Sequence, residues 1–294
     1  MVLAEKIFLI VNSYAGHKAG EKTVDVVVPY LLNKGFVVEY AFTNHPGHAT
    51  ELAIKAASEG YDLVVAVGGD GTANEVAQGL FGSVTVMGII PIGSGNGLAR
   101  ELGISMNIRE SLKTLIDGKT LLLDVYNLND QRFLCTCGIG FDALIADKMS
   151  KTSSRGFFGY VKLVMKEIST YKPVDVRMKI DGVIVEEPVF LITFANSSQF
   201  GNKAYIAPGA SMTDGLIDVV VVKEFAAVWI PVIAFALFFK LIPKLPFVNC
   251  YKAKMIDIEL ADTKYFHFDG EPGKLDVPAM ISLNPEKIRM CCRN

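Results

Sequence analysis

The sequence predicts two domains of different fold class: an N-terminal α/β domain with a parallel sheet, followed by a C-terminal antiparallel β-sandwich domain. In the first part of the chain, nearly continuous apolar runs such as residues 7–11 and 63–67 alternate with helical stretches. This pattern is typical of parallel strands that are covered by helices on both faces. Further on, residues 174–181 alternate strictly between apolar and polar side chains. Such alternation favours antiparallel strands with one buried face.

The elements of the first domain follow one another at short intervals. The apolar run 7–11 predicts the first strand, and a Gly-containing loop, 12–20, follows it. The next elements in order are a helix through residue 32, a strand at 36–42, a helix at 48–59, and strands at 63–67 and 84–90. Sheets of this class bind ligands at the carboxyl ends of their strands. The loops after residues 11, 67 and 90 are rich in Gly and Asn, which predicts a binding site at that edge.

The second domain begins where the hydrophobic pattern changes. Asp181-Gly182, at the end of the alternating run, is a strong hairpin signal. Further strands are predicted at 183–194, 216–222, 255–260 and 264–269. We therefore expect an α/β domain at residues 1–125 and a β-sandwich domain at residues 126–283. The C-terminal tail, from about residue 284 to residue 294, is long enough to return to the first domain and is a candidate for an added part of it.

The composition describes a globular chain and excludes several classes of protein. Of the 294 residues, 51% are hydrophobic and 20% are charged, which excludes a disordered chain. The net charge of −2 provides no basic field for nucleic acid, so we expect no nucleic-acid partner. The five cysteines include no C-x-x-C pair, and because a strand-like run begins at residue 6 we expect no signal peptide. These features predict a cytoplasmic protein.

The first glycine-rich motif reads Gly68-Gly69-Asp70-Gly71-Thr72-Ala73-Asn74-Glu75; it follows an apolar strand and opens a helix. Glycines let backbone N–H groups approach a polyphosphate closely, and a helix N-terminus favours negative charge. Asp70 would repel a phosphate unless a magnesium ion lay between them. An alternative is that the motif only starts the helix, because Thr72 and Glu75 have capping-box spacing. The two interpretations are compatible.

A second glycine-rich loop, residues 91–100, follows the next strand and again opens a helix. The common nucleotide motifs do not match, since residues 16–23 have one residue too few for a P-loop. Leu98 likewise stands where a dinucleotide fingerprint has its third glycine. Two glycine-rich loops at one sheet edge nevertheless predict a phosphate site, with residues 12–16 as a third wall.

Together with other short motifs, these loops form an ordered set that covers nearly the whole chain. In order, the motifs are 12–16, Thr43, 68–75, 91–100, 138–142 (Gly-Ile-Gly-Phe-Asp), 214–215 (Asp-Gly) and 269–271 (Asp-Gly-Glu). With this set the chain resembles the diacylglycerol kinase catalytic-domain family, which includes soluble bacterial lipid kinases, sphingosine kinases and ceramide kinases. The resemblance implies an NAD-kinase-like and lipid-kinase-like fold.

The resemblance also implies roles for individual residues. The implied nucleotide contacts are Asn12, Ser13, Tyr14, Ala15, Gly16, Thr43, Gly68, Gly69, Asp70, Gly71, Thr72, Asn74, Glu75, Gly93, Ser94, Gly95 and Asn96. Asp70 would be essential for the metal–nucleotide, and Glu271 matches the general base that takes the proton from the lipid hydroxyl. Ser211, Asp214 and Leu216 match a structural magnesium site, to which Ser211 and Leu216 offer backbone carbonyls. Asp124 matches a carboxylate in a network with that site.

The function implied by this resemblance is phosphoryl transfer from ATP, with Mg²⁺, to the hydroxyl of diacylglycerol or a related lipid. The first domain would bind the nucleotide and the second the lipid, which would be presented at a membrane surface. Gly97 departs from many bacterial members, which have Asp there, and brings the loop closer to sphingosine kinases. A sphingoid-base kinase, an NAD kinase and a non-catalytic lipid- or nucleotide-binding regulator therefore stay open as alternatives. The oligomeric state is also open, a homodimer included.

An uncharged apolar segment, residues 225–239, has Pro231 inside it. A helix that spans a membrane needs about 20 apolar residues, so we expect no transmembrane segment here. Three interpretations stay open: a buried core helix, an apolar wall for a lipid chain, or a membrane-docking helix bordered by Lys240 and Lys244. The last would make the protein peripheral at the membrane.

Several other residues have both a functional and a structural interpretation. His45 and His48 could ligate a metal, but without a third ligand nearby we favour loop and helix-start roles. Asp142 is either functional or a helix cap. In an extended chain, one face would carry His267, Asp269 and Glu271, and the other face would carry Phe266 and Phe268. A turn at Gly270 would change this arrangement. Other candidates are the charges Arg155, Lys162 and Lys166, which face either anionic lipid or solvent, and Cys291-Cys292, which we assign to packing.

Overall fold

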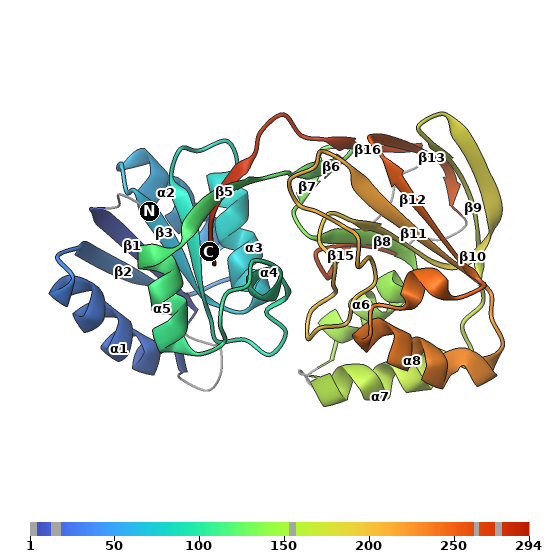
Figure 1. Ribbon diagram of the computed structural model, residues 1–294, viewed down its shortest axis with the longest axis horizontal. Helices are drawn as coiled ribbons and strands as arrows, with labels where there is room; N and C mark the ends of the chain where they lie inside the picture. The colour runs from blue at the N-terminus through green and yellow to red at the C-terminus, as the bar shows by residue number, and fades with distance from the viewer. Residues whose placement is uncertain (1–4, 13–18, 153–156, 262–264, 274–277, 294) are drawn as a thin grey trace. The chain divides into compact units, whose positions relative to one another are not determined.

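The computed structural model describes residues 5–12, 19–152, 157–261, 265–273 and 278–293. The chain divides into two compact units (Figure 1). The N-terminal unit comprises residues Met1–Leu123 together with Glu286–Asn294, and the C-terminal unit comprises Asp124–Pro285. Ser13, Tyr14, Ala15, Gly16 and Arg155 lie outside the described residues.

The N-terminal unit is built on one mixed sheet with the strand order β2-β1-β3-β4-β17-β5. Its parallel strands are β1 (Lys6–Asn12), β2 (Val37–Thr43), β3 (Leu63–Gly68), β4 (Val86–Pro91) and β17 (Ile288–Cys292). The final strand, β5 (Lys119–Leu123), runs antiparallel to β17. The sheet is therefore mostly parallel, as the apolar runs predict, and the end of the chain supplies one of its inner strands.

Helices cover this sheet and bury its central strands. They are α1 (Ala19–Asn33), α2 (His48–Ser58), α3 (Asp70–Leu80), α4 (Gly97–Glu101) and α5 (Ile108–Asp117). Every residue of β3 is buried, which explains its uninterrupted apolar sequence. The core between sheet and helices includes Leu9, Leu31 and Leu112.

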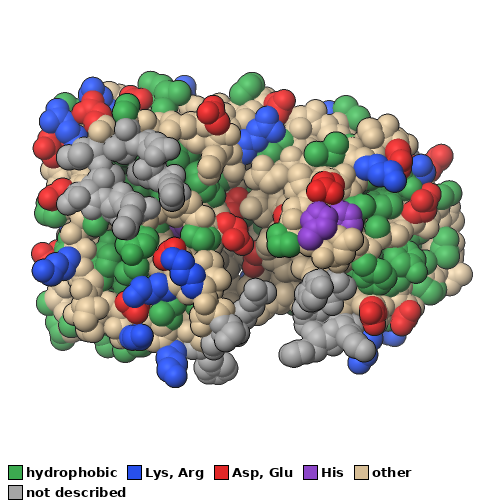
Figure 2. Space-filling model, turned by 180° about the vertical axis from the view of Figure 1, so that it is seen from behind, with side chains coloured by type: hydrophobic (Ala, Val, Ile, Leu, Met, Phe, Trp, Pro, Cys, Tyr) green, Lys and Arg blue, Asp and Glu red, His purple; other side chains and the backbone are tan. Residues whose placement is uncertain are grey.

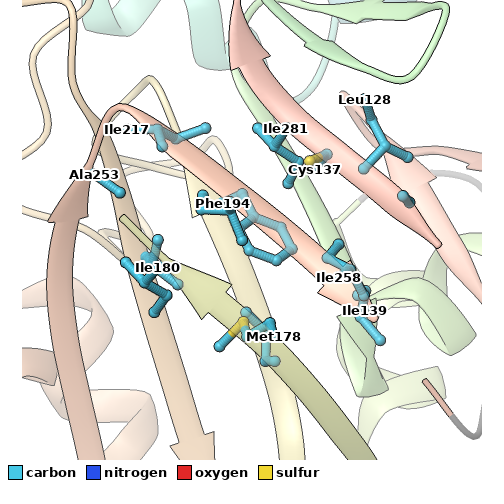
Figure 3. Packing of buried hydrophobic residues seen from close by; sticks show 14 of the residues in the cluster. Leu128, Cys137, Ile139, Met178, Ile180, Phe194, Ile217, Ala253, Ile258 and Ile281 are labelled. Atoms are coloured by element: carbon cyan, nitrogen blue, oxygen red, sulfur yellow. The ribbon is translucent and has the colours of Figure 1, made fainter. Parts of the chain in front are cut away.

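The C-terminal unit contains an antiparallel sheet with the path β15-β14-β8-β10-β9-β13-β16-β6-β7, to which β11 and β12 are added at β10. The strands are β6 (Tyr126–Leu128), β7 (Gln131–Phe133), β8 (Thr136–Gly140), β9 (Val174–Ile180), β10 (Val183–Ala195), β11 (Ile217–Lys223), β12 (Val248–Ala253), β13 (Met255–Ala261), β14 (Phe266–Phe268), β15 (Glu271–Gly273) and β16 (Ala279–Leu283). Alternate side chains meet in an apolar core that includes Phe194, Met178 and Ile258 (Figure 3). The predicted change to antiparallel strands is confirmed.

The hairpin between β9 and β10 shows why the local sequence signal was informative. Ile180 pairs with Val183, and the two residues between them are Asp181 and Gly182. Both have positive φ angles, 45° and 86°. This is the backbone of a type I′ turn, which matches the right-handed twist of the strands and favours Asp-Gly.

The helices of the C-terminal unit are α6 (Phe141–Ser150), α7 (Phe157–Glu167) and α8 (Ile230–Phe238), with short 3₁₀ turns η1 (Ala227–Trp229) and η2 (Ile242–Lys244). They gather at one end of this unit (Figure 1). No helix within the described ranges is long and apolar enough to span a membrane.

The apolar segment 225–239 forms η1 and α8, and its interpretation as a buried core helix is wrong. Ala236 is the buried residue of α8, whereas Phe235 is 53% exposed and Phe239 is 61% exposed. Pro231 lies in the first turn of α8, where a missing N–H costs nothing, so it starts this helix instead of breaking it. One side of α8 packs on the unit, and the rest of its apolar surface faces solvent.

Candidate functional site

The carboxyl ends of four parallel strands bring the candidate nucleotide residues together at one edge of the N-terminal sheet. Asn12, at the end of β1, pairs with Thr43, at the end of β2. Gly68, at the end of β3, pairs with Pro91, at the end of β4. The Asn12 side chain donates to Thr72 Oγ1 over 2.8 Å, which ties the end of β1 to the first turn of α3.

The first glycine-rich loop makes a tight entry into α3. Gly69 is extended and caps the helix without a side-chain hydrogen bond. A Cβ on Gly68 would overlap the Thr72 side chain. The predicted capping box is wrong, because Glu75 Oε2 instead accepts from the backbone N–H of Ala49 on α2, over 3.1 Å.

The second glycine-rich loop packs directly on the first, backbone against backbone. A Cβ on Gly93 would lie 2.5 Å from the Cα of Gly69. The Asp70 carboxylate bridges the loops by accepting the N–H groups of Asn96 (2.7 Å) and Gly97 (2.6 Å). Burial raises the pKa of Asp70, although these N–H groups, that of Leu98 and the charge of Arg100 act in the opposite direction. Asp70 therefore joins the two loops into one structure.

The remaining candidates of this edge differ in exposure. Asn96 is buried in a left-handed conformation, and its side chain holds the loop closed through Gly93. Ser94 and Gly71 are exposed, and a Cβ on Gly71 would meet nothing within 4 Å. Asn74, on α3, accepts a hydrogen bond from Gln78 one turn later. The structure thus leaves exposed polar groups next to a rigid pair of loops.

The candidate metal residues lie in one loop of the C-terminal unit. Asp124 Oδ2 accepts the N–H of Gly215 over 2.8 Å, and its own N–H donates to the Met212 carbonyl. Asp214 Oδ1 accepts from the backbone N–H of Leu216 over 3.1 Å. Ser211 contacts Thr213 through its hydroxyl. Asp124 and the loop 211–216 are therefore adjacent in space, although they are far apart in the chain.

Asp218 and Lys252 also belong to this cluster, although neither was predicted from the sequence. They face each other in the register of β11 and β12, with Lys252 Nζ 2.7 Å from Asp218 Oδ2 and 3.3 Å from Asp214 Oδ2. Burial, and then the charge of Asp214, raise the pKa of Asp218, while Lys252 acts to lower it. Only the strand register reveals this pair, since neither residue belongs to a motif.

The turn that presents Glu271 is a two-residue hairpin between β14 and β15. Asp269 and Gly270 have φ angles of 48° and 86°, and Phe268 pairs with Glu271. Directly opposed residues point to the same face of a sheet, so Glu271 shares a face with Phe268 and not with His267. The chain turns at Gly270, which is the exception that the sequence left open, so the shared face that an extended chain would give His267, Asp269 and Glu271 does not form.

The Asp269 carboxylate anchors this turn. It accepts the backbone N–H groups of Leu134 (2.9 Å), Cys135 (2.7 Å) and Thr136 (2.9 Å). Burial raises the pKa of Asp269, against the effect of these three N–H groups. Glu271 itself is exposed, and its carboxylate makes no hydrogen bond within the described part of the chain.

His45 and His48 have a third potential ligand that the sequence analysis did not recognise. Their rings stack with centroids 4.7 Å apart, and Glu51 brings a carboxylate oxygen within 4.8 Å of the ring nitrogens. Figure 2 shows histidine side chains beside an acidic one at the surface. His48 Nδ1 already accepts the N–H of Asn44, and the cluster lies at the N-terminus of α2, whose partial positive charge disfavours a cation.

Comparison with known proteins agrees with both units. Residues 6–128 match the diacylglycerol kinase catalytic domain, and residues 135–292 match the YegS C-terminal NAD kinase beta sandwich-like domain. A diacylglycerol kinase of Bacillus subtilis is 30% identical over 273 residues, which cover 90% of this chain and 89% of that protein. A diacylglycerol kinase of Mycobacterium tuberculosis is 29% identical over 229 residues, which cover 74% of each chain.

A solved structure shows the same fold along the full length. The crystal structure of a diacylglycerol kinase from Bacillus anthracis superposes with a TM-score of 0.79 at 27% identity and covers 100% of this chain and 98% of that one. The fold and the matched domains define a lipid kinase, an enzyme that transfers phosphate to an alcohol group. The chain belongs to the diacylglycerol kinase family. Membership implies ATP as the phosphoryl donor.

Proposed function

We propose that this lipid kinase phosphorylates the free hydroxyl of a diacylglycerol. The observation that carries this proposal is the rigid pair of glycine-rich loops at the strand ends, in a chain whose relatives are named diacylglycerol kinases. Backbone N–H groups next to Gly69 and at the start of α3 bind the phosphates of ATP. The named relatives do not favour a sphingoid base as the acceptor, although Gly97 makes the second loop resemble that of sphingosine kinases.

Magnesium fits two groups of residues. The Asp70 carboxylate accepts the N–H groups of Asn96 and Gly97, and that of Leu98 adds to them, so part of its lone-pair capacity is left for a metal–nucleotide. In the C-terminal unit, Asp214 and the carbonyls of Ser211 and Leu216 are the oxygen donors that a hard cation prefers. When bound beside the phosphates, magnesium neutralises part of their negative charge.

Negative charge concentrates around the second group. Burial, and then the carboxylates of Asp124, Asp214 and Asp218, raise the pKa of the Tyr126 hydroxyl. Burial lowers the pKa of Lys252, but Asp218 and Asp214 outweigh burial and raise it overall. An excess of carboxylates around one ammonium group favours an additional cation, and we assign that role to structural magnesium.

Glu271 is the residue that we assign as general base. Its carboxylate accepts the proton of the lipid hydroxyl while the hydroxyl oxygen attacks the γ-phosphorus of ATP and the bond to ADP breaks. The exposure of Glu271 at the tip of a hairpin supports this assignment, since the lipid must reach it from outside.

Docking of α7 and α8 on a membrane surface gives the enzyme access to its lipid. Both helices pack on the same apolar cluster through one side and expose large apolar side chains on the other. The exposed apolar set comprises Tyr160, Val161, Met165, Val228, Val232, Phe235, Phe238 and Phe239. Lys162, Lys166 and Lys244 are exposed near it along the chain, so the surface combines apolar groups with positive charge, as binding to anionic lipid requires.

A cytoplasmic location, peripheral at the membrane, stays a prediction, and so does a homodimer. Sedimentation velocity of the purified protein measures the oligomeric state, and fractionation of expressing cells measures the location.

Replacing Glu271 by glutamine tests the proposed function. We expect Glu271→Gln to lower kcat by at least about 100-fold, because the amide cannot accept the proton, and to leave the affinity for ATP unchanged. The assay follows transfer of labelled phosphate from ATP to diacylglycerol, sphingosine or NAD. Glu224→Gln, which changes another exposed glutamate of the C-terminal unit, is the matched control. Near-normal turnover of Glu271→Gln would refute the base, and preferred labelling of sphingosine or NAD would refute the acceptor.

A further inference from the structure

A buried histidine and a buried aspartate meet directly behind the turn that carries Glu271. His267 Nε2 lies 3.2 Å from Asp142 Oδ2, and their side chains are only 4% and 8% exposed. The same Asp142 oxygen accepts the hydroxyl of Thr193 over 3.2 Å. Polar groups that are buried in this way need such partners.

The hydrogen bonds of His267 define its protonation. The backbone N–H of Gly270 donates to His267 Nδ1 over 3.4 Å, so Nδ1 carries no proton. The remaining ring proton therefore lies on Nε2 and is donated to Asp142. A neutral imidazole thus links the carboxylate of Asp142 to the Gly270 peptide, one residue before Glu271.

The strand register provides the space for this link. Gly138 of β8 is directly opposite His267 on β14 and opposite Thr193 on β10. A Cβ on Gly138 would overlap Asp142 Oδ2 and lie 2.7 Å from His267 Nε2. Gly140, with a φ of 102°, lets the chain turn into α6, which brings Asp142 back over Gly138. The Gly-Ile-Gly-Phe-Asp motif therefore provides the space in which His267 and Asp142 meet.

Glu271 depends on this support because its own side chain has none within the described residues. Its carboxylate is exposed, so the backbone of the Asp269-Gly270 turn decides where it points. Asp269 holds one side of the turn to residues 134–136, and His267 holds the Gly270 peptide. Both contacts belong to the C-terminal unit.

We propose that His267 and Asp142 are positioning residues, which fix the Gly270 peptide and thereby the orientation of Glu271 for proton acceptance. The inference rests on the proposed role of Glu271 as general base. A displacement of about 1 Å at a reacting group is enough to lower a rate by roughly 100-fold, so a loose turn reduces turnover without removing any substrate contact. Positioning of this kind lowers kcat and leaves KM nearly unchanged.

The test compares variants of His267 that keep different hydrogen bonds. We expect His267→Ala to lower kcat by about 10- to 100-fold, with KM for ATP and for diacylglycerol within about twofold of the parent. His267→Asn retains an acceptor near the position of Nδ1 and is expected to recover most of the lost kcat, whereas His267→Gln, which keeps only the donor toward Asp142, does not. Asp142→Ala, which removes the acceptor for Nε2, is expected to lower kcat as His267→Ala does, whereas Asp142→Asn, which still accepts from Nε2, is expected to recover most of that loss.

Ile258→Ala is the matched control for loss of stability. Ile258 is fully buried in the same sheet, on β13, whose neighbouring strands are β9 and β16 and not the strands of the Glu271 hairpin. We expect it to lower Tm at least as much as His267→Ala and to keep kcat within about twofold, measured well below Tm. If folded His267→Ala retains the parent kcat, or if both variants lose kcat equally, the positioning role is refuted.

Two further measurements complete the test. Histidine ¹⁵N spectra of the unsubstituted protein are expected to show His267 neutral with its proton on Nε2; a proton on Nδ1 would overturn the link even if no variant folds. Glu271→Gln is assayed beside these variants. An active Glu271→Gln refutes the base and the positioning role together, whereas an inactive Glu271→Gln with an unaffected His267→Ala refutes the positioning role alone.

Discussion

Replacing Gly93 by alanine is expected to push the two glycine-rich loops of the N-terminal unit apart. The added Cβ would lie 2.5 Å from the Cα of Gly69 and 2.9 Å from Asn96 Oδ1. Carbon atoms in van der Waals contact are about 3.5–4.0 Å apart, so one loop must move by about 1 Å. Because Gly69 has no side chain that could rotate away, the movement must also strain the hydrogen bonds that the N–H groups of Asn96 and Gly97 donate to Asp70.

The expected cost follows from this overlap. Forcing an extra methyl group into a packed site costs about 1–3 kcal/mol. For a domain of this size, about 2 kcal/mol corresponds to a decrease in Tm of roughly 5–10 °C. The affinity for ATP should fall by about tenfold, since the loops no longer present their N–H groups to the same phosphates. Gly71→Ala, in the same motif but with open space around its Cβ, should keep or slightly raise Tm.

Circular dichroism melting curves measure the stability of both variants. The single tryptophan, Trp229, lies in the C-terminal unit, so its fluorescence provides an internal reference that Gly93→Ala should not change. Calorimetric titration with a non-hydrolysable ATP analogue measures the affinity. If the free energy of unfolding of Gly93→Ala is within about 0.5 kcal/mol of the parent value and the variant binds the analogue equally well, the proposed close packing of the loops is refuted.

Two further predictions concern the apolar surface of α8 and the buried thiols. The double variant Phe235→Ser, Phe239→Ser should reduce binding to phosphatidylcholine vesicles that contain phosphatidylglycerol by at least about tenfold, because each exposed ring that enters the membrane contributes about 1 kcal/mol or more. Val84→Ser, at an even more exposed apolar position of the N-terminal unit, is the control, and undiminished vesicle binding of the double variant in co-sedimentation would contradict membrane docking through α8. Burial, and then the neighbouring Cys292, raise the pKa of Cys291 to about 12, so at pH 8 its thiolate fraction in the folded protein is only about 10⁻⁴. Ellman's reagent should therefore label exposed Cys250 long before Cys291 until guanidinium chloride unfolds the chain, and equal labelling rates in the folded protein would contradict this assignment.

Local patterns in the sequence were sufficient for the fold class and for the edge that carries the nucleotide loops. The uninterrupted apolar run of β3 indicates a strand buried on both faces, and the alternation in β9 indicates one with a single buried face. Because parallel strands end at the same edge of a sheet, the loops after β1, β3 and β4 had to lie near one another. The Asp181-Gly182 turn could also be predicted from the sequence, since only certain residues tolerate its backbone angles.

Contacts between distant segments could not be predicted in this way. The bridge between Asp70 and Asn96 depends on the packing of two loops, whereas the ion pair of Asp218 with Lys252 and the pair of His267 with Asp142 depend on strand register. Periodicity reports whether a side chain is buried, but it contains no information about which other buried group lies opposite. A turn of two residues likewise reverses the face on which Glu271 points, although the preceding strand alternates regularly.

Whether the apolar segment 225–239 is buried or exposed also depends on the tertiary structure. Its composition alone is equally compatible with a core helix and with an exposed one. One side of α8 packs on the apolar cluster that includes Phe190 and Val222, and no described element covers its other side. The sequence by itself thus determined the two fold classes and the glycine-rich edge, because these follow from local periodicity and backbone freedom. Only the tertiary structure decided which side chains meet and which apolar face stays exposed, because both depend on what the rest of the chain places opposite them.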